Sequence, residues 1–443
     1  MMSIVEEYLE QIPLWAAKKN SLTDIRAYMK ELGNPDDGMK IIHVAGTNGK
    51  GSVCAFLTSV LSEAGYTVGT FVSPHLEETR ERFLFNGELV GVKEYESAFH
   101  KVKKLSETMG QRGFAPPTYF EFLFYMSMVI NASLRPDFVI LETGLGGRLD
   151  VTNVIHHPVA VIITSVSMDH MEYLGNTIEE IAWEKAGIMK PGAPVIYDDN
   201  YPEVSAVILR RAKELGCRVY PVSRKDYSVM ERGEEFTRMS VRNSDGGQLV
   251  LDVPSIADYQ LMNVVVAIQA VGILRKCVPC YLASGDIMVG IRRSYWPGRM
   301  EQVLPGIYLD GAHNAGGIDA LVQTIFMLEQ ETGKKVHLLF AAVSDKEYGR
   351  MIDRLSEKVE LASVSIAKLK TERGMDPEVL AEEFRKLTDC PVETFATAED
   401  AFTHVLTVKN DDYVFCVGSL YLIGEIKQIL SHSAAHLLGS EKR

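Results

Sequence analysis

The stretch "IIHVAGTNGKGSVCAFLTSVL", Ile41–Leu61, decides how the chain folds. An apolar run leads into a glycine-rich turn and then into a helical pattern, which is the strand–turn–helix context that a phosphate-binding loop requires. The usual spacing, G-x-x-x-x-G-K-[ST], is not met, because Val44 stands where the first glycine should be and Gly51 separates Lys50 from Ser52. The stretch predicts a parallel sheet covered by helices, with an unusual phosphate loop at this turn.

The loop contains the residue types that bind a triphosphate. Gly46, Gly49 and Gly51 let backbone N–H groups approach phosphate oxygens closely. Lys50 supplies a mobile positive charge, and the hydroxyl of Ser52 at the helix start can bind Mg²⁺. The alternative interpretation is a glycine-rich turn whose lysine is only solvated.

Length, composition and charge limit the class of protein. At 443 residues the chain is too long for one core, since single cores stop growing near about 250–300 residues, so two domains are expected. The formal net charge of −13 argues against a nucleic-acid partner, which would require a basic face. No apolar run approaches the roughly 18 residues of a membrane span and the N-terminus has no basic leader, so we expect a cytoplasmic protein without a membrane partner. Cys277 and Cys280 lack the second ligand pair of a zinc site, so we expect ordinary thiols.

The first part of the chain alternates apolar runs with helical patterns, as in an α/β fold with a mostly parallel sheet. The expected strands are Lys40–Ala45, Thr67–Val72, Asp137–Glu142, Val159–Val166 and Ala193–Tyr197. The expected helices are Ser52–Ala64, Glu94–Met109, Tyr119–Ala132, Thr177–Met189 and Ala257–Lys276. We expect Arg82–Val90 to form a hairpin around Asn86-Gly87, and Val219–Val253 to form an antiparallel excursion at one edge.

Pro297-Gly298 is the expected domain boundary, because proline removes a backbone donor and glycine frees the next residue. This divides the chain into a domain of residues 1–296 and a smaller α/β domain of residues 297–443. Four apolar runs in the second part predict further strands, namely "GIYLDGAHN", "KVHLLFAAVSD", "VELASVSI" and "DDYVFCVGS".

A series of motifs, in order and over nearly the whole chain, resembles the folylpolyglutamate synthase / dihydrofolate synthase family of the Mur ligase superfamily. The motifs are "GTNGKGS", "SPHL" (Ser73–Leu76), "LGGRLDVTN" (Leu145–Asn153), "DHMEYLG" (Asp169–Gly175), "EKAGIMKPG" (Glu184–Gly192), "WPGRME" (Trp296–Glu301), "DGAHN" (Asp310–Asn314) and "GSLYL" (Gly418–Leu422). The displaced serine of the phosphate loop is the superfamily's own version of that loop. The resemblance implies a P-loop ATPase domain of the Mur ligase type, followed by a smaller Rossmann-like domain.

The resemblance also implies a reaction. ATP would phosphorylate the γ-carboxylate of a (tetrahydro)folate polyglutamate, and the amine of L-glutamate would displace the phosphate. Whether dihydropteroate is also converted to dihydrofolate is left open by the sequence. Catalysis then consists mainly of holding crowded anionic oxygens together and neutralising their charge.

Metal ions are the expected means of neutralising that charge. Glu142 ends an apolar strand, where open α/β sheets place their ligands, and a carboxylate is a hard oxygen ligand for Mg²⁺. By resemblance, Ser52 and Glu142 would hold one Mg²⁺, and Ser73, Glu142 and His170 would hold a second. Taken alone, Ser73 could be an ordinary turn residue and His170 a capping or solvated histidine.

Lys185 is expected to be modified. An ion pair with the glutamates near it in "IEEIAWEKAGIMK" is the alternative. In many members of the family the matching lysine is carbamylated by CO₂ and helps to orient the metal. This reaction requires a neutral amine, and hence a desolvated lysine with a depressed pKa.

The remaining expectations concern substrates. By resemblance, Lys50, His170 and Lys185 are catalytic, and ATP is bound by Thr47, Asn48, Gly49, Lys50, Gly51, Ser52, Asn263, Arg299, Asp310 and His313. Aromatic and apolar residues could flank the pterin, although an aromatic stripe at helical spacing more often belongs to the core; they are Phe114, Pro116, Tyr119 and Phe120. Arg80, Arg82 and Arg148 are candidates for the glutamate tail, and Asp345 and Lys346 for the incoming glutamate.

Two rival functions stay open at this point. One is a cell-wall amino-acid ligase of the same fold, which would normally carry a further N-terminal domain for a nucleotide sugar, whereas only about 40 residues precede the loop here. The other is a regulator that binds ATP and makes no bond. We expect the chain to act as a monomer on ATP, L-glutamate and folate or dihydropteroate.

Overall fold

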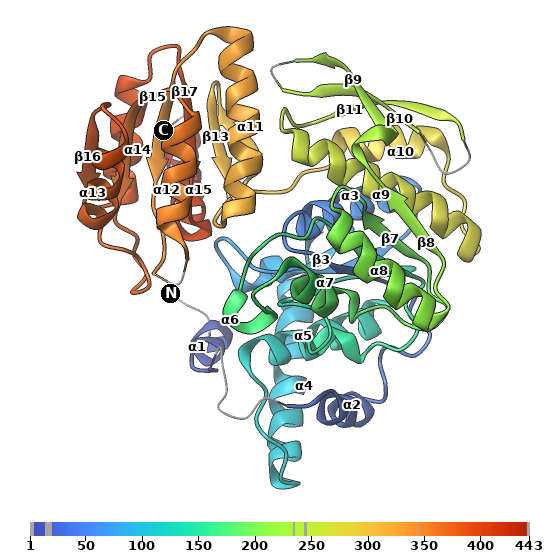
Figure 1. Cartoon of the computed structure of the whole chain (residues 1–443). Helices are drawn as coiled ribbons and strands as arrows, with labels where there is room; N and C mark the ends of the chain where they lie inside the picture. The colour runs from blue at the N-terminus through green and yellow to red at the C-terminus, as the bar shows by residue number, and fades with distance from the viewer. Residues whose placement is uncertain (1–3, 14–19, 234, 243–245, 345, 441–443) are drawn as a thin grey trace. The chain divides into compact units, whose positions relative to one another are not determined.

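The computed structural model describes residues 4–13, 20–233, 235–242, 246–344 and 346–440, and it describes two compact units. The first unit consists mainly of residues 4–232 and 262–295, and the second of residues 255–261 and 296–440. Helix α9 (Asp258–Cys277) contributes residues to both units. Each unit is an α/β structure (Figure 1), as the alternation of strands and helices predicts.

The first unit is built on an eight-stranded sheet with the order β4-β3-β2-β5-β1-β6-β7-β8. All neighbours from β2 to β8 in this order are parallel, and β3 and β4 form the antiparallel edge. The strands are β1 (Ile41–Ala45), β2 (Val68–Phe71), β3 (Phe83–Phe85), β4 (Glu88–Leu89), β5 (Phe138–Glu142), β6 (Ala160–Ile163), β7 (Val195–Asp198) and β8 (Val219–Val222). The five expected strands and the hairpin are therefore confirmed.

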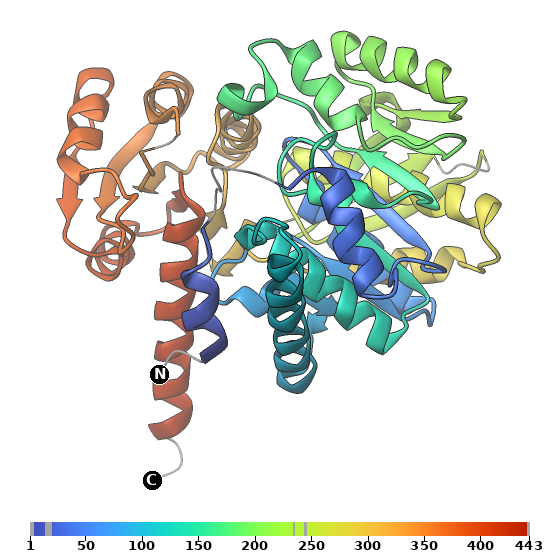
Figure 2. The same cartoon turned by 90° about the horizontal axis from the view of Figure 1, so that it is seen from below.

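Helices of this unit bury the apolar side chains that made the strands recognisable. Helix α3 packs against β1, β2 and β5, and α4 packs against α5 and α2, which are seen together from below in Figure 2. The helices are α1 (Ile4–Glu10), α2 (Leu22–Glu31), α3 (Lys50–Glu63), α4 (Val92–Gln111), α5 (Tyr119–Leu134), α6 (Met171–Leu174), α7 (Ile178–Ala186), α8 (Pro202–Leu215) and α10 (Ser284–Arg293), with 3₁₀ turns η1 (Thr79–Arg82), η2 (Val151–Val154) and η3 (Arg224–Asp226).

The expected antiparallel excursion is only partly correct. Strands β9 (Tyr227–Arg232), β10 (Thr237–Arg242) and β11 (Gln248–Val253) form a separate antiparallel sheet. Val219–Val222, however, is β8, which pairs in parallel with β7 at the edge of the main sheet. β8 is a short, half-exposed edge strand of four residues, so it lacks the long apolar run that marks the buried strands and was not separated from the excursion by pattern.

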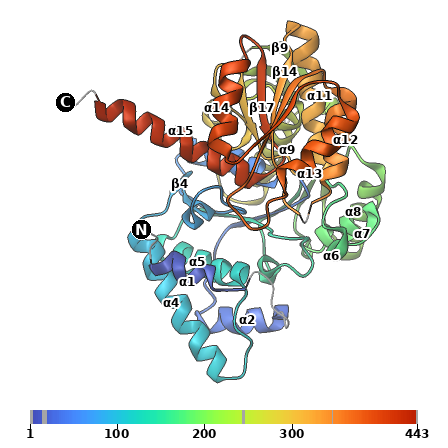
Figure 3. The ribbon, with the colours of Figure 1, turned by 90° about the vertical axis from the view of Figure 1, so that its left-hand side faces the viewer.

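The second unit has a six-stranded sheet with the order β12-β13-β17-β14-β15-β16, in which only β12 is antiparallel. Figure 3 shows α14 on one side of β14 and β17, and α11 and α12 on the other. The strands are β12 (Arg299–Leu304), β13 (Ile307–Asp310), β14 (Val336–Phe340), β15 (Leu361–Ala367), β16 (Val392–Phe395) and β17 (Tyr413–Val417), and the helices are α11 (Ala315–Thr332), α12 (Tyr348–Lys358), α13 (Pro377–Leu387), α14 (Ala398–Val408) and α15 (Leu420–Ser440).

Among the described residues, α9 alone is long and apolar enough to cross a membrane by length and composition. Its most apolar window is 78% buried inside the structure. A core helix satisfies the same criteria, and the burial of α9 identifies it as one.

Candidate active site

The phosphate loop joins β1 to α3, and its backbone has the conformation that its glycines permit. Gly46 has φ +152° and Gly49 has φ +86°, values that residues with a side chain rarely adopt. Space is restricted as well. A Cβ on Gly46 would lie 1.8 Å from Thr164 Oγ1, and one on Gly49 would lie 2.3 Å from Asn263 Oδ1. Glycine is therefore required at both positions by conformation and by close packing.

The loop is fastened to the segment that follows β6. The Thr47 N–H donates to the Ser165 carbonyl at 2.7 Å, and the Thr164 hydroxyl donates to the Asn48 carbonyl at 2.7 Å. The Thr47 hydroxyl donates to the Ser167 carbonyl and accepts from its N–H, both at 3.1 Å. Hydrogen bonds of Thr47 and Asn48 therefore hold the loop against the segment that follows β6.

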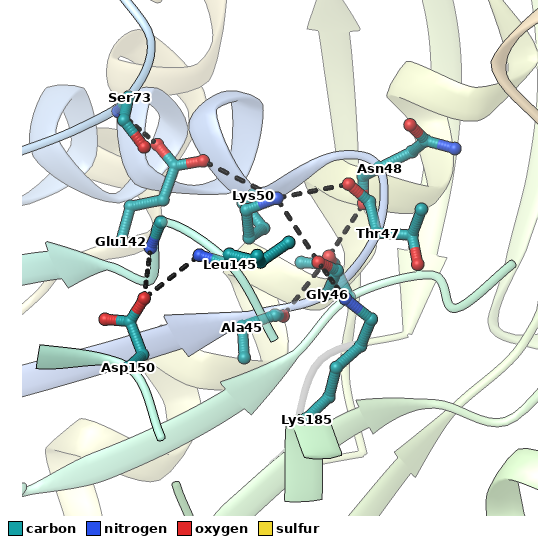
Figure 4. Close-up of polar contacts among 12 residues, drawn as sticks. Ala45, Gly46, Thr47, Asn48, Lys50, Ser73, Glu142, Leu145, Asp150 and Lys185 are labelled. Carbon is teal, nitrogen blue, oxygen red and sulfur yellow. Dashed lines mark hydrogen bonds and ion pairs between the residues drawn. The ribbon is translucent and has the colours of Figure 1, made fainter. Parts of the chain in front are cut away.

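Lys50 lies between the loop and the end of β5 (Figure 4). Its Nζ donates to the Gly46 carbonyl at 3.2 Å and to the Thr47 carbonyl at 3.1 Å. The same Nζ is 3.8 Å from Glu142 Oε1, a long ion pair whose carboxylate is buried. The interpretation of Lys50 as a merely solvated lysine is wrong.

Glu142 ends β5 beside the loop. Its position follows from register, since Val44 of β1 pairs with Glu142 in the parallel sheet. Its Oε2 accepts a hydrogen bond from the Ser73 N–H at 3.0 Å (Figure 4), which brings Ser73 and Glu142 together. Ser52 is buried in the first turn of α3, two residues after Lys50.

Lys185 reaches the same loop from α7. Its ammonium is buried and donates to the Gly46 carbonyl at 2.8 Å (Figure 4). Burial, together with the nearby charge of Lys50, lowers the pKa of Lys185 to about 7, while Asp169 and Asp150 oppose the shift. The adjacent Glu184 instead pairs with Arg148 at 2.9 Å.

His170 is placed differently from these residues. It lies in the left-handed region at the start of α6, with φ +49°, and its side chain is 40% exposed. Its ring is 3.8 Å from Asp169. The structure brings Lys50, Ser73, Glu142 and Lys185 together around the loop and leaves the His170 ring partly in solvent.

Asn263 belongs to the first unit and packs on Gly49. Gln260, three residues earlier on α9, belongs to the second unit, where it donates to the Arg299 carbonyl at 3.4 Å. The two amides therefore have different surroundings, although their spacing predicts one helix face.

The other predicted nucleotide residues form a polar cluster within the second unit. Arg299 donates to the Gly311 carbonyl at 3.1 Å, and His313 Nδ1 is 2.7 Å from the same oxygen. Asp310 is buried and accepts from the Tyr259 hydroxyl and from the N–H groups of Met300 and Ala312. Burial raises the pKa of Asp310, and these donors together with Arg299 oppose the rise.

Several of the residues expected to contact the substrates have partners within the protein. Arg82 donates to His75 Nδ1 at 2.9 Å and stacks over Tyr119, and Arg80 pairs with Glu78 at 3.0 Å. Asp345 lies outside the described residues. Cys277 and Cys280 take part in no disulfide within the described part of the chain.

Three residues that support the site have little or no signal in the sequence. Asp150 and Thr164 organise the backbone beside Glu142 and Gly46, and Tyr259 binds Asp310. Asp150 stands in the "LGGRLDVTN" motif, which was the only signal for it. Thr164 and Tyr259 have no distinguishing pattern in the sequence.

Comparison with known proteins assigns the class. The Mur ligase middle domain matches residues 95–271, and the Mur ligase glutamate ligase domain matches residues 298–420. Together with the α/β fold and the phosphate loop, these matches define an ATP-dependent ligase of the Mur type.

Relatives that match more than 90% of this chain indicate its family within the Mur-type ligases. The chain is 33% identical over 429 residues to the dihydrofolate synthase/folylpolyglutamate synthase of Bacillus subtilis, covering 93% of this chain and 95% of that protein. It is 31% identical to the folylpolyglutamate synthase of Lacticaseibacillus casei, covering 96% and 97%. The folylpolyglutamate synthase of Mycobacterium tuberculosis, solved with ADP and AMPPCP, superposes with a TM-score of 0.85 at 26% identity, covering 96% and 97%. The chain belongs to the folylpolyglutamate synthase / dihydrofolate synthase family.

Proposed function

We propose that this chain uses ATP to add L-glutamate to the γ-carboxylate of (tetrahydro)folate polyglutamates. The observation that carries the proposal is the arrangement around the Gly46 carbonyl, where Lys50 and a desolvated Lys185 converge beside the buried Glu142. A solved complex of a relative with AMPPCP and folate, with a TM-score of 0.83 and 30% identity, supports this choice of substrates. The name of the B. subtilis relative supports dihydropteroate as a second acceptor.

The proposed reaction has two transfers. A carboxylate oxygen of the folate attacks the γ-phosphorus of ATP, and ADP leaves with the electrons of the broken P–O bond. The glutamate nitrogen then attacks the acyl carbon, the C–O bond to phosphate breaks, and the nitrogen loses a proton. Both transfers gather negative oxygens in one place, so the protein contributes mainly position and positive charge.

The loop residues have a defined part in the first transfer. The N–H groups of residues 48–52 would face the phosphates, since that of Thr47 already donates to the Ser165 carbonyl. Lys50 would exchange its two carbonyl acceptors for phosphate oxygens. Asn263, which already packs on Gly49, would contact the adenine. Arg299, Asp310 and His313 remain proposed ATP contacts on the strength of the family motifs alone.

The residues beside Glu142 fit Mg²⁺. A buried carboxylate and the hydroxyl-bearing Ser52 and Ser73 are hard oxygen donors, which Mg²⁺ prefers. Among the described residues there is no cluster of three His, Cys, Asp or Glu, so hydroxyls and phosphate oxygens would complete the coordination. We propose Ser52 and Glu142 for one ion, and Ser73, Glu142 and His170 for a second. When bound, Mg²⁺ would neutralise charge on the phosphate oxygens.

Lys185 would serve the site as a carbamate. With its pKa lowered to about 7, a large share of the amine is neutral at physiological pH and able to react with CO₂. The product would place a second anion beside the loop, in addition to Glu142. Its position against the Gly46 carbonyl, in a region without bulk water, supports this modification.

We also propose a monomer that acts in the cytoplasm without a nucleic-acid or membrane partner. The net charge of −13 supports the first exclusion, since the phosphate backbone repels an acidic surface. Size-exclusion chromatography with light scattering measures the mass directly.

The decisive experiment incubates the purified protein with ATP, Mg²⁺, L-glutamate and either tetrahydrofolate or dihydropteroate. Products are followed by mass and phosphate release is followed in parallel. We expect phosphate release that depends on both glutamate and a folate, with products longer by one glutamate residue. Lys50→Met is the matched inactive variant, since it removes the charge but keeps an unbranched side chain of similar length. Activity only on a UDP-linked sugar peptide, or ATP binding without turnover of any acceptor, would overturn the proposal.

A further inference from the structure

A chain of buried side-chain hydrogen bonds runs from the central strand to the segment after Glu142. His43 of β1 is fully buried, and its Nε2 is 2.8 Å from Thr152 Oγ1. The Thr152 hydroxyl donates in turn to Asp150 Oδ1 at 2.6 Å. All three residues belong to the first unit, and His43 stands three positions before Gly46 of the phosphate loop.

The number of available protons fixes the donor and the acceptor of each of these hydrogen bonds. The single hydroxyl proton of Thr152 is used in the bond to Asp150, so Thr152 Oγ1 accepts from His43 and His43 carries its proton on Nε2. His43 Nδ1 is then a bare acceptor, and it is one of the buried polar atoms without a hydrogen-bond partner among the described residues. Burial lowers the pKa of His43 to about 3, helped by Lys190, so the ring is neutral.

Asp150 in turn binds the backbone of the segment that follows Glu142. Its Oδ2 accepts from the N–H groups of Gly144 and Leu145, both at 3.0 Å, and its Oδ1 also accepts from the Thr152 N–H at 3.0 Å. Gly144 follows Glu142 by two residues. The carboxylate therefore fixes the first residues of the segment Gly144–Asp150, which we call the β5 loop.

The other end of the β5 loop lies against the helix that carries Lys185. The Arg148 N–H donates to the Glu184 carbonyl at 2.7 Å. A Cβ on Gly147 would lie 2.7 Å from the Glu184 carbonyl oxygen and 2.9 Å from that of Lys185. The loop therefore touches the backbone of α7 at Lys185 and begins beside Glu142.

A purely structural role explains His43 poorly. Its neighbours on β1 are apolar and fully buried, and an unpaired buried acceptor such as Nδ1 is destabilising. An aliphatic residue would avoid that cost but could not donate to Thr152. The polar chain is therefore expected to serve the geometry of the site rather than the stability of the sheet.

We propose that His43, acting through Thr152 and Asp150, is a positioning residue that holds the β5 loop and thereby sets the places of Glu142 and Lys185 for ligation. The inference rests on the proposed function, because it assigns those two residues to the reaction. It concerns turnover rather than substrate binding, since neither His43 nor Thr152 is exposed to a ligand.

The experiment compares Thr152→Val, Thr152→Ser and Thr58→Val with the unaltered enzyme. Thr152→Val keeps the shape and removes the hydroxyl, and Thr152→Ser keeps the hydroxyl. Thr58→Val is the matched control, because Thr58 is also buried and loses a 2.7 Å hydrogen bond to Thr70 of β2, in which no residue of the β5 loop takes part. Measured quantities are kcat, the KM for ATP, the Mg²⁺ concentration for half-maximal rate, and hydrogen exchange of the amides of residues 144 and 145.

For Thr152→Val we expect kcat to fall about tenfold, the cost of roughly one lost positioning hydrogen bond, with the KM for ATP changed less than about twofold. Exchange of the two amides should accelerate and the Mg²⁺ requirement should rise, while Thr152→Ser and Thr58→Val stay near the unaltered values. Retention of kcat by Thr152→Val, or an equal loss in Thr58→Val, would overturn the inference.

If Thr152→Val does not fold, His43→Gln and His43→Leu replace it. Gln keeps an N–H donor for Thr152 and should retain turnover, whereas Leu should lose about tenfold. Equal activity of these two variants contradicts the proposal. The proposed function is judged separately, by whether the unaltered enzyme forms the glutamylated product at all.

Discussion

The Lys185 amine should react with CO₂ at neutral pH, because its pKa is lowered to about 7. The perturbation is to remove CO₂ by purging the enzyme, and then to restore a fixed concentration of dissolved CO₂ at a series of pH values. With this pKa the neutral fraction is about one tenth at pH 6, one half at pH 7 and nine tenths at pH 8. The initial rate of reactivation should therefore rise about fivefold from pH 6 to pH 7 and less than about twofold from pH 7 to pH 8.

The assay is recovery of glutamate-dependent phosphate release against time after CO₂ is added. Lys185→Arg keeps the positive charge but cannot form a stable carbamate, so it should stay inactive at every pH. Lys185→Ala should recover activity with a small carboxylate such as acetate or formate. A reactivation rate that climbs tenfold per pH unit through pH 9 would show an ordinary lysine, and activity that survives purging unchanged would remove the carbamate from the mechanism.

Three further outcomes are expected. Lys185→Met in CO₂-free buffer should be more stable than the unaltered protein at pH 7, and the difference in free energy of unfolding should shrink by about 2 kcal/mol by pH 9. Above about pH 7 the folded amine has released its proton, whereas the unfolded lysine, with a pKa of 10.5, still holds one. The stability of the unaltered protein therefore rises with pH between pH 7 and pH 9. Urea unfolding at both pH values measures the difference in free energy of unfolding. Gly46→Ala should abolish ATP binding and lower stability more than Gly65→Ala. A Cβ at Gly46 would lie 1.8 Å from Thr164 Oγ1, whereas nothing lies within 4 Å of a Cβ at Gly65. Gly65→Ala should cost only about 1–2 kcal/mol of stability, because of its left-handed backbone, and should leave activity intact. Ser52→Ala should lower kcat by about 100-fold if its hydroxyl binds Mg²⁺, and near-normal kcat would remove Ser52 from the metal ligands.

Much of the fold was predictable because parallel strands buried on both faces are continuous apolar runs. Phe138–Glu142 and Ala160–Ile163, for example, are fully buried and were recognisable from composition alone. β12 and β16 were not predicted, since half-exposed edge strands mix polar and apolar residues. The pairing of β8 with β7 depends on tertiary contacts that no local pattern encodes.

The site was predictable where a motif or a strand end marked it. Lys50 and Glu142 follow from the glycine-rich turn and from the end of an apolar strand. The contact of Lys185 with the Gly46 carbonyl spans 139 positions, and the bond between His43 and Thr152 spans 109, so neither pair has a local signal. His43 is a single polar residue in an apolar strand, and its partner Thr152 is brought to it only when the chain folds.

The ammonium of Lys50 is bonded to two carbonyls of its own loop, and Thr47 and Asn48 are bonded to the segment after β6. These bonds hold the backbone of the loop in one conformation within the folded unit, and a backbone that is already ordered loses little conformational entropy when a ligand binds to it. If Lys50 binds phosphate as proposed, its side chain has only to rotate, exchanging two neutral acceptors for anionic ones. Rotation of a side chain is far faster than rearrangement of a main-chain segment, so binding through Lys50 would need no slow conformational step.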